Sequence, residues 1–407
     1  LNDDGNSYTV TGCSEVLYGE VVIPDTYNNK PVTVVGKSAF MYEENIDSII
    51  IGSNVKVIEA YAFFETSATS VSLPEGLKVI EDNALHGYIL SLDIPDSVEY
   101  IGARGVLAQN FVENNGYYYI DNWLIEAAVD GGPRRVEVLP GTVGIADDII
   151  EYMDDETGDK YVVIPGTVKY IGPRSLEGYS GVYVSDDNPY FEEKDGIVYT
   201  ENFERLVYAS PSFVGVEVVI PDTVKTIGKE AFRKCEKLKT VYLGKSVTDI
   251  GKAAFADCTA LSDVEVTSEL KELPNQIFSN CTSLKSITLP RSIENIGVFA
   301  FDNVNELTVK GWRMTDVRDY AVLNNFGFEP INSGDANGDG AVNGKDVLAL
   351  RKYIVGLTNE INEDACDINS DYKLNGKDVL QMRKLIIGLA IENDITPFDN
   401  SLSDIDK

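Results

Sequence analysis

The chain has 407 residues, and its 66 acidic and 34 basic side chains give a formal net charge of −32. Such an acidic surface repels nucleic acid and anionic membranes, and no apolar run is long enough to span a bilayer. One histidine, five cysteines and no C-x-x-C pair argue against both a disulfide framework and a zinc site.

From about residue 8 to residue 331 the chain repeats a short pattern. An aliphatic anchor residue, usually followed by glycine, returns mostly every 21–23 residues, as in Ile101-Gly102 and Ile250-Gly251. In the best copies a small–aromatic pair follows the anchor, for example Ala39-Phe40. A coil this short cannot bury its apolar face alone, so successive coils must stack.

We therefore predict one strand and one short helix or helical turn per coil, wound into a right-handed solenoid. The run Leu238-x-x-Val241-x-Leu243 supplies inward-pointing strand residues. This pattern resembles the BspA-like class of leucine-rich repeat over roughly residues 8–331. The resemblance implies an α/β leucine-rich repeat solenoid that acts first as a binding surface.

Two steps of the repeat are long and hold insertions at about 110–138 and 185–218. Aromatic and polar residues alternate there around Asp121-Asn122 and Asp195-Gly196, which predicts two β-hairpins. Exposed flat aromatics would suit sugar binding, whereas rings that bury one face would pack the hairpins onto the coils. The candidate ligand-binding aromatics are Tyr117, Tyr119 and Trp123 on the first hairpin, with Tyr183, Tyr190 and Tyr199 near the second.

Cys235, Cys258 and Cys281 are separated by the repeat period, so they should occupy one slot in consecutive coils. Free cysteine packs as a small hydrophobe, and we expect a buried ladder of thiols. The array should end in a cap over residues 308–331, made of a short helix and a final strand.

Two near-copies of a 12-residue loop lie 32 residues apart near the C-terminus. Each places oxygen-bearing side chains at positions 1, 3, 5, 9 and 12 and a backbone carbonyl at 7, which is typical of an EF-hand-type calcium loop. We expect two Ca²⁺ ions. The candidate ligands are Asp335, Asn337, Asp339, Ala341, Asn343 and Asp346 in the first loop, and Asp367, Asn369, Asp371, Lys373, Asn375 and Asp378 in the second.

Apolar residues at helical spacing follow each loop, and a glycine closes each run, which predicts helices within 347–357 and 379–389. Residues 328–334 before the first loop are rich in helix breakers, so the unit is loop–helix (F-hand) rather than helix–loop–helix. Between 335–357 and 367–389, 14 of 23 positions are identical.

Over about residues 334–395 the chain closely resembles a type I-like dockerin, the small all-α module that binds cohesin modules of a cellulosomal scaffoldin. The resemblance implies a calcium-ordered fold and two near-identical faces, either of which can dock after a half-turn. Gly-Lys stands where clostridial relatives have Ser-Thr, which leaves the cohesin class open, and Tyr372 replaces a loop glycine. The implied cohesin-binding residues are Gly344, Lys345, Leu348, Arg351 and Lys352 in one copy, and Gly376, Lys377, Leu380, Arg383 and Lys384 in the other.

Catalysis has little support in the sequence. His86 is expected to be packed or simply exposed, no G-x-S-x-G surrounds a serine, and phosphate loops and dinucleotide fingerprints are absent. Acidic runs such as Asp147-Asp148 are expected to be solvated, although a glycosidase would need only two carboxylates.

We therefore expect a repeat domain over 1–331, a dockerin over 332–395 and a tail over 396–407. The expected function is a secreted, non-catalytic cellulosome component whose repeat domain is a protein-interaction or adhesion surface. A plant polysaccharide-binding module is the alternative, and a glycoside hydrolase or enzyme inhibitor comes last. No signal peptide is visible, and the start at Leu1 looks like a mature or trimmed product, so extracellular location is inferred from the dockerin-like module.

Overall fold

The computed structural model describes residues 1–127, 135–149, 161–177, 179, 181–212, 214–266, 270–290, 292–311, 316–330, 334–337, 341–368 and 373–388. Backbone contacts divide the chain into two compact units. The first comprises Leu1–Gly215, Thr223–Lys237 and Ile250–Cys258, and the second comprises Val216–Asp222, Leu238–Asp249 and Thr259–Lys407.

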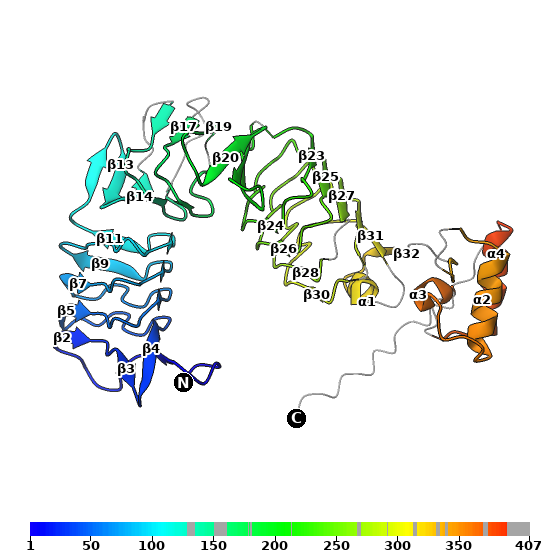
Figure 1. The fold of residues 1–407 in the computed structure, drawn as a ribbon, viewed down its shortest axis with the longest axis horizontal. Coiled ribbons are helices and arrows are strands. Elements are labelled where there is room, and N and C mark those ends of the chain that lie inside the picture. Colours follow the sequence, from blue (N-terminus) through cyan, green and yellow to red (C-terminus); the bar gives the residue numbers. More distant parts are fainter. Residues whose placement is uncertain are drawn as a thin grey trace. The chain divides into compact units, whose positions relative to one another are not determined.

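In the first unit each coil adds short parallel strands to separate sheets, and strands of successive coils lie side by side (Figure 1). The anchor strands are β1 (Tyr8–Val10), β4 (Lys30–Val35), β6 (Val57–Ile58), β8 (Val79–Ile80) and β10 (Tyr100–Ile101), with β3 (Thr26–Tyr27) folded back on β4. The other strands there are β2 (Gly19–Val22), β5 (Ile46–Ile50) and β7 (Ser70–Ser72), and the pair β9 (Leu85–Ile89) and β11 (Val106–Ala108).

Both predicted hairpin insertions form, and each rejoins the stack through its last strand. The first comprises β12 (Val112–Asn114), β13 (Tyr117–Ile120) and β14 (Trp123–Ala127), and continues to β16 (Gly144–Ile145) and β18 (Tyr170–Ile171). The second comprises β20 (Phe191–Lys194), β21 (Ile197–Thr200) and β22 (Arg205–Ala209), and continues to β24 (Thr226–Ile227) and β26 (Asp249–Ile250). A separate three-stranded sheet holds β15 (Arg135–Glu137), β17 (Tyr161–Ile164) and β19 (Gly181–Val184).

In its described residues the second unit has a six-stranded parallel sheet, a two-stranded sheet and four helices. The large sheet runs β23 (Glu217–Val219), β25 (Thr240–Leu243), β27 (Asp263–Val266), β29 (Ser286–Thr288), β31 (Thr308–Gly311) and β32 (Gly327–Pro330), and the small one pairs β28 (Glu272–Leu273) with β30 (Asn295–Ile296). Helix α1 (Asp316–Leu323) packs on β31 and β32. The expected terminal helix and strand are therefore present.

The glycine after an anchor residue is required by the close approach of neighbouring coils. A Cβ atom on Gly251 would lie 2.3 Å from the backbone nitrogen of Lys229, and one on Gly102 would lie 2.5 Å from that of Asp82. Real Cβ atoms do not approach backbone so closely, so a larger residue would force the coils apart.

The segment after each anchor forms turns rather than a helix. The Phe40 N–H donates to the carbonyl of Ala62 in the next coil (2.8 Å), and the Ala39 N–H donates back to Gly36 (3.2 Å). Ser38 and Tyr42 have φ of 55° and 63°. Alternate amides thus bond between coils and left-handed residues recur four apart, a combination that excludes an α-helix. Among the described residues before Asp316 there is no helix.

Rings and thiols from equivalent positions fill the interior of the coils. The Phe40 and Phe63 rings stack at 5.2 Å and 4°, and those of Phe232 and Phe255 stack at 4.9 Å and 11°. The predicted burial of the three thiols is confirmed, because Cys235, Cys258 and Cys281 form no disulfide and are fully buried. The Cys258 Sγ lies 3.1 Å from the Phe232 carbonyl oxygen.

The dockerin-like segment forms α2 (Gly344–Ile354), α3 (Glu363–Cys366) and α4 (Gly376–Ile386). Its core gathers Leu350, Cys366, Ile368 and Met382. The long helices begin three residues earlier than their apolar patterns suggest, because Asn343 and Asn375 act as N-caps within capping boxes. The predicted loop–helix order is confirmed. Across the described residues, no helix has both the length and the apolar character needed to cross a bilayer.

Candidate functional site

Four carboxylates of the two candidate calcium loops lie inside the C-terminal module. Asp335, Asp346, Asp367 and Asp378 have exposed fractions of 7%, 0%, 1% and 0%. Burying a carboxylate costs several kcal/mol unless a cation or hydrogen bonds balance it. The remaining acidic candidates, Asp339 and Asp371, lie with Asn369 and Tyr372 outside the described residues.

The carboxylate at position 12 closes each loop from the first turn of the following helix. Asp346 accepts hydrogen bonds from the backbone N–H groups of Asn337 (3.1 Å) and Asn343 (2.8 Å). In the second loop Asp378 accepts from the N–H of Asn375 (2.9 Å). The two loops therefore use one construction, as their sequences indicate.

The asparagine at position 9 serves the helix as well as the loop. The Asn343 side-chain oxygen accepts from the N–H of Lys345 (3.0 Å), and its amide donates to the carbonyl of Ala341 (3.0 Å). Asn375 does the same with Lys377 (2.8 Å) and Lys373 (2.9 Å). Because these oxygens already cap a helix, they suit the position-9 role in which a water bridges to the metal.

Negative charge from both loops reaches one buried thiol. Burial raises the pKa of Cys366, and the nearby carboxylates of Asp378, Asp346, Glu363 and Asp335 contribute less, so that together they bring it to about 12. Within the described residues no group of three or more His, Cys, Asp or Glu side chains forms a metal cluster. Buried carboxylates and loop carbonyls are nevertheless the hard oxygen donors that Ca²⁺ prefers, so the residues present fit this ion. Bound calcium would supply positive charge that balances them.

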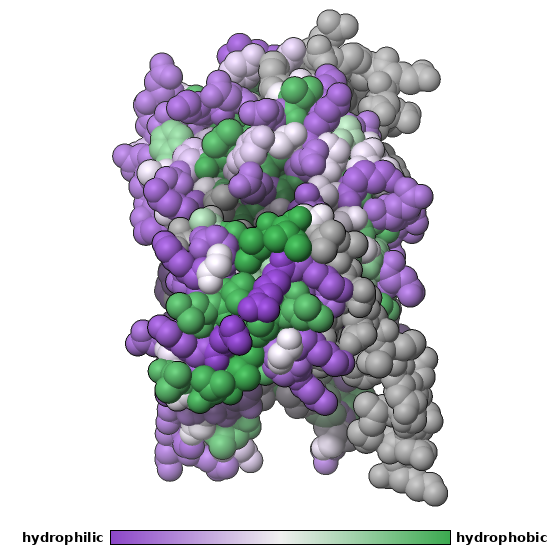
Figure 2. All heavy atoms as spheres, turned by 90° about the vertical axis from the view of Figure 1, so that its right-hand side faces the viewer, coloured by the Kyte–Doolittle hydropathy of each residue, from purple (hydrophilic) through white to green (hydrophobic). Residues whose placement is uncertain are grey.

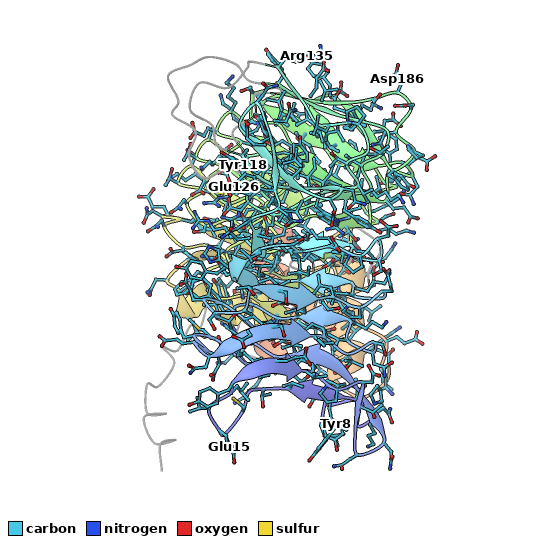
Figure 3. The ribbon with its side chains drawn as sticks, turned by 90° about the vertical axis from the view of Figure 1, so that its left-hand side faces the viewer. Tyr8, Glu15, Tyr118, Glu126, Arg135 and Asp186 are labelled. Atoms are coloured by element: carbon cyan, nitrogen blue, oxygen red, sulfur yellow. The ribbon has the colours of Figure 1, made fainter. Side chains whose placement is uncertain are left out.

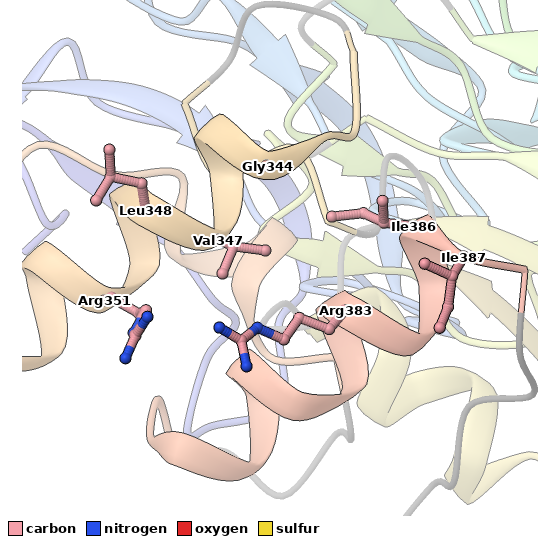
Figure 4. Close-up of a pocket in the computed structure, with 7 residues that line it drawn as sticks. All are labelled: Gly344, Val347, Leu348, Arg351, Arg383, Ile386 and Ile387. Atoms are coloured by element: carbon pink, nitrogen blue, oxygen red, sulfur yellow. The ribbon is translucent and has the colours of Figure 1, made fainter.

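A groove of about 530 Å³ lies between α2 and α4 (Figure 4). It brings the start of α2 beside the end of α4, so Leu348 and Arg351 of one predicted face share it with Arg383 of the other. In Figure 4 the Arg383 side chain extends from α4 toward Val347.

Most predicted cohesin-binding side chains are accessible. Leu348 and Leu380 are 55% and 54% exposed, and the face in Figure 2 mixes apolar and strongly hydrophilic side chains. The exposed members are Gly344, Lys345, Arg351, Lys352, Gly376, Lys377 and Arg383, while Lys384 is half-buried. Sequence reasoning missed Ile386 and Ile387. Ile386 had a signal, because Ile354 occupies the same position in the first copy and is also exposed.

The aromatic strip expected on the first hairpin is wrong. Tyr117, Tyr119 and Trp123 are buried, with exposed fractions of 5%, 3% and 1%. The Tyr117 hydroxyl lies 3.0 Å from that of Tyr179, and Trp123 stacks on Tyr170 with an interplanar angle of 2°. These rings pack the hairpin onto the coils, which is the alternative that aromatics in strands favour.

The outward side of that hairpin carries a different aromatic pair. Tyr118 lies opposite Glu126, as Figure 3 shows, and its ring meets Phe111 edge-on at 5.1 Å. Near the second hairpin Tyr199 is buried, whereas Tyr183 and Tyr190 are 49% and 39% exposed. The alternation of side chains along the hairpin was visible in the sequence. Which of the two alternating sets faces the core was not.

Two residues considered for catalysis, His86 and Asp147, make packing or ion-pair contacts within the repeat array. His86 stacks on Phe64 at 5.2 Å, which fits the expected packing role. Asp147 was expected to be solvated, but its side chain is 1% exposed. It accepts a hydrogen bond from the Tyr100 hydroxyl (3.1 Å) and pairs with Lys229 (3.4 Å), and burial raises its pKa to about 6. Asp147 joins coils that are distant in sequence.

Two family models match this chain. The BspA-type leucine-rich repeat region matches in six copies over residues 21–110 and 212–325, and the type I dockerin domain matches residues 333–387. The segment left unmatched between the two repeat blocks holds both hairpins. The class is thus a repeat solenoid joined to a dockerin, as its sequence motifs predict. The chain belongs to the BspA-type leucine-rich repeat family and carries a C-terminal type I dockerin domain.

Solved structures of repeat proteins are also similar. A leucine-rich cell surface protein of Faecalibacterium prausnitzii is 24% identical, with 76% of this chain and 85% of that chain covered and a TM-score of 0.40. A leucine-rich repeat protein of Eubacterium ventriosum is 20% identical, with 76% and 80% covered and a TM-score of 0.33. The pneumococcal vaccine antigen PcpA is 19% identical, with 81% and 92% covered and a TM-score of 0.30. No curated protein matches.

A type I dockerin implies a cohesin partner, and leucine-rich repeats imply protein interaction. Both are non-catalytic kinds of module, and both occur in extracellular proteins.

Proposed function

We propose that this protein is a secreted, non-catalytic component of a cellulosome, tethered by its dockerin to a cohesin of a scaffoldin. Two Ca²⁺ ions, one in each loop, order the dockerin. The repeat array presents a surface to another protein. The observation that carries the proposal is the pair of capped loop–helix units, with buried carboxylates inside and exposed leucine, arginine and lysine side chains outside.

The groove between α2 and α4 supports docking in two orientations. Gly344, Leu348 and Arg351 lie beside the end of α4, and Gly376, Leu380 and Arg383 are the matching residues of the second copy. A cohesin that recognises the first arrangement would meet the same side chains after a half-turn. With two equivalent modes, removal of one halves the association constant, a change of about 0.4 kcal/mol.

Cohesin binding by the full chain tests this proposal. A panel of cohesins is measured by calorimetry in calcium and again in excess chelator. We expect one cohesin class to bind in calcium only. In that class Leu348→Ala or Leu380→Ala alone should weaken binding about twofold, and the double variant at least 100-fold. A single variant that removes binding would exclude the second mode, and no binding to any cohesin would refute the docking role.

The outward face of the β23–β32 sheet supports a protein partner for the array. Strand pairing aligns Glu217 with Thr240 and Asp263, and Val219 with Tyr242 and Glu265. Val219 is 65% exposed and Tyr242 is 36% exposed. Apolar groups beside carboxylates, on a chain of net charge −32, complement a partner with a basic, partly apolar surface.

A polysaccharide ligand for the array is the second candidate. The first-hairpin rings no longer favour it because they are buried, but Tyr183 and Tyr190 remain exposed.

A further inference from the structure

The sheet β15–β17–β19 turns two tyrosines and an ion pair away from the core. Strand pairing sets Arg135 opposite Tyr161, and Glu137 and Tyr183 on either side of Val163. The Tyr161 and Tyr183 ring centroids are 5.9 Å apart with planes at 42°. Arg135 and Glu137 are exposed, and Figure 3 shows Arg135 at the outer surface. This face therefore combines flat rings with paired donors and acceptors.

A cavity of about 380 Å³ adjoins the same strands at β15. Its polar lining comes from the side chains of Asn114, Asn115, Arg135 and Glu137, and Tyr117 and Leu139 are among its apolar lining. The Arg135 Nε lies 3.2 Å from the Glu137 Oε1, so the two charges compensate each other. Its volume falls within the range of small-molecule sites.

We propose that this cavity and the adjoining tyrosines bind a neutral glycan chain. Sugar hydroxyls both donate and accept hydrogen bonds. The two amides, the guanidinium and the carboxylate together offer both the donors and the acceptors that a polyhydroxylated ring needs. The exposed face of Tyr183 suits the C–H face of a second ring. Two strand spacings, about 10 Å, separate β15 from β19, so the ligand is an extended chain of several sugar rings rather than a monosaccharide.

Charge selects a neutral ligand. The compensated Arg135–Glu137 pair leaves no net positive charge at the rim, and the net charge of −32 repels acidic glycans. This site uses neither the dockerin groove nor the β23–β32 sheet. The proposal rests on the second candidate function, a polysaccharide ligand for the array, and fails independently of the docking role.

The test measures binding of the full-length protein, in chelator, to barley β-glucan, xyloglucan, xylan and microcrystalline cellulose, by affinity electrophoresis and pull-down. We expect binding to at least one of them. Tyr183→Ala and Arg135→Ala should each weaken it at least tenfold, because both side chains are exposed and contact the ligand directly. Tyr88→Ala, which removes a 66% exposed tyrosine of β9, is the matched control and should leave binding unchanged.

Three outcomes would overturn the proposal: no binding of the wild-type protein to any of the four probes, equal weakening in the control, or binding that ignores both variants. Thermal unfolding of every variant confirms that the fold is retained. Cohesin binding by the same protein variants, measured separately in calcium, distinguishes failure of this site from failure of the docking role.

Discussion

Asp147 keeps a carboxyl group inside the repeat array, where the chain returns to the stack after its first insertion. Its backbone N–H donates to the carbonyl of Ile101 (2.8 Å), and its side chain meets Tyr100, Lys229 and Arg174. These partners come from coils far apart in sequence, so the carboxyl group joins segments that the hairpins separate. Burial is the largest influence on its pKa, and it outweighs the two cations.

The buried Asp147 should make stability depend on pH. Its folded pKa of about 6 lies above the ordinary 3.8, so between these values the folded state binds more protons than the unfolded state. The contribution of Asp147 to stability therefore falls as the pH rises from about 4 to about 6, by at most about 3 kcal/mol. Asp147→Asn lacks this dependence. Urea unfolding is measured at pH 4.5 and pH 7. The free energy of unfolding of the wild type, relative to that of the variant, should be higher at pH 4.5 than at pH 7.

All other acidic side chains are the same in both proteins, so the difference between the free energies of unfolding of wild type and variant removes their effect. A difference that stays constant between the two pH values would contradict the assignment.

The individual coil is held at its distance from the next by glycines and by alternating backbone hydrogen bonds. Gly251 lies against the backbone of Lys229, as Gly172 lies against that of Asp147, where a Cβ would stand 2.4 Å from the nitrogen. The elements are short, and most of their amides bond to neighbouring coils rather than within the coil. Stability is therefore carried by the interfaces between coils.

Replacing Gly251 by alanine should separate two coils. We expect Gly251→Ala to destabilise the array by about 1–3 kcal/mol. The added Cβ overlaps the Lys229 backbone, which cannot move without shifting the rest of its coil. Gly87→Ala is the matched control, since its Cβ would lie 3.3 Å from the Thr66 carbonyl oxygen. Thermal unfolding of both variants decides the matter. Equal losses would show that the close approach is not what the anchor glycine serves.

At the scale of the whole molecule, two kinds of stabilisation meet in one chain. The repeat array rests on an apolar interior of stacked rings and aliphatic residues. The dockerin has a much smaller apolar core and holds four buried carboxylates. A small core that buries several carboxylates depends on metal for its stability.

Calcium removal should therefore unfold the dockerin and leave the array folded. We expect excess chelator to remove the helical circular dichroism of α2 and α4 while the β-sheet signal of the array stays. Adding calcium back should restore the helical signal. Native mass spectrometry should then count two bound ions. Asp346→Ala with Asp378→Ala should reproduce the apo state. Helices that persist in chelator would show that the hydrogen bonds to these carboxylates suffice without metal.

The sequence by itself determined the repeat period, the two hairpins, the buried cysteines and the two loop–helix units. Each of these depends on spacing along the chain, such as the Ile-Gly anchors or the oxygens from Asp335 to Asp346, and local spacing fixes local geometry. Both family assignments followed from these patterns.

Only the tertiary structure decided which side of each strand faces the core and which distant residues meet. A strand has two faces, so alternation around Tyr117, Tyr118 and Tyr119 left the buried face undecided until the hairpin packed on Tyr170 and Tyr179. The burial of Asp147, the groove that unites Arg351 with Arg383, and the cavity beside Arg135 all depend on contacts between separate segments. Such contacts follow from how coils and helices pack together, which no local pattern records.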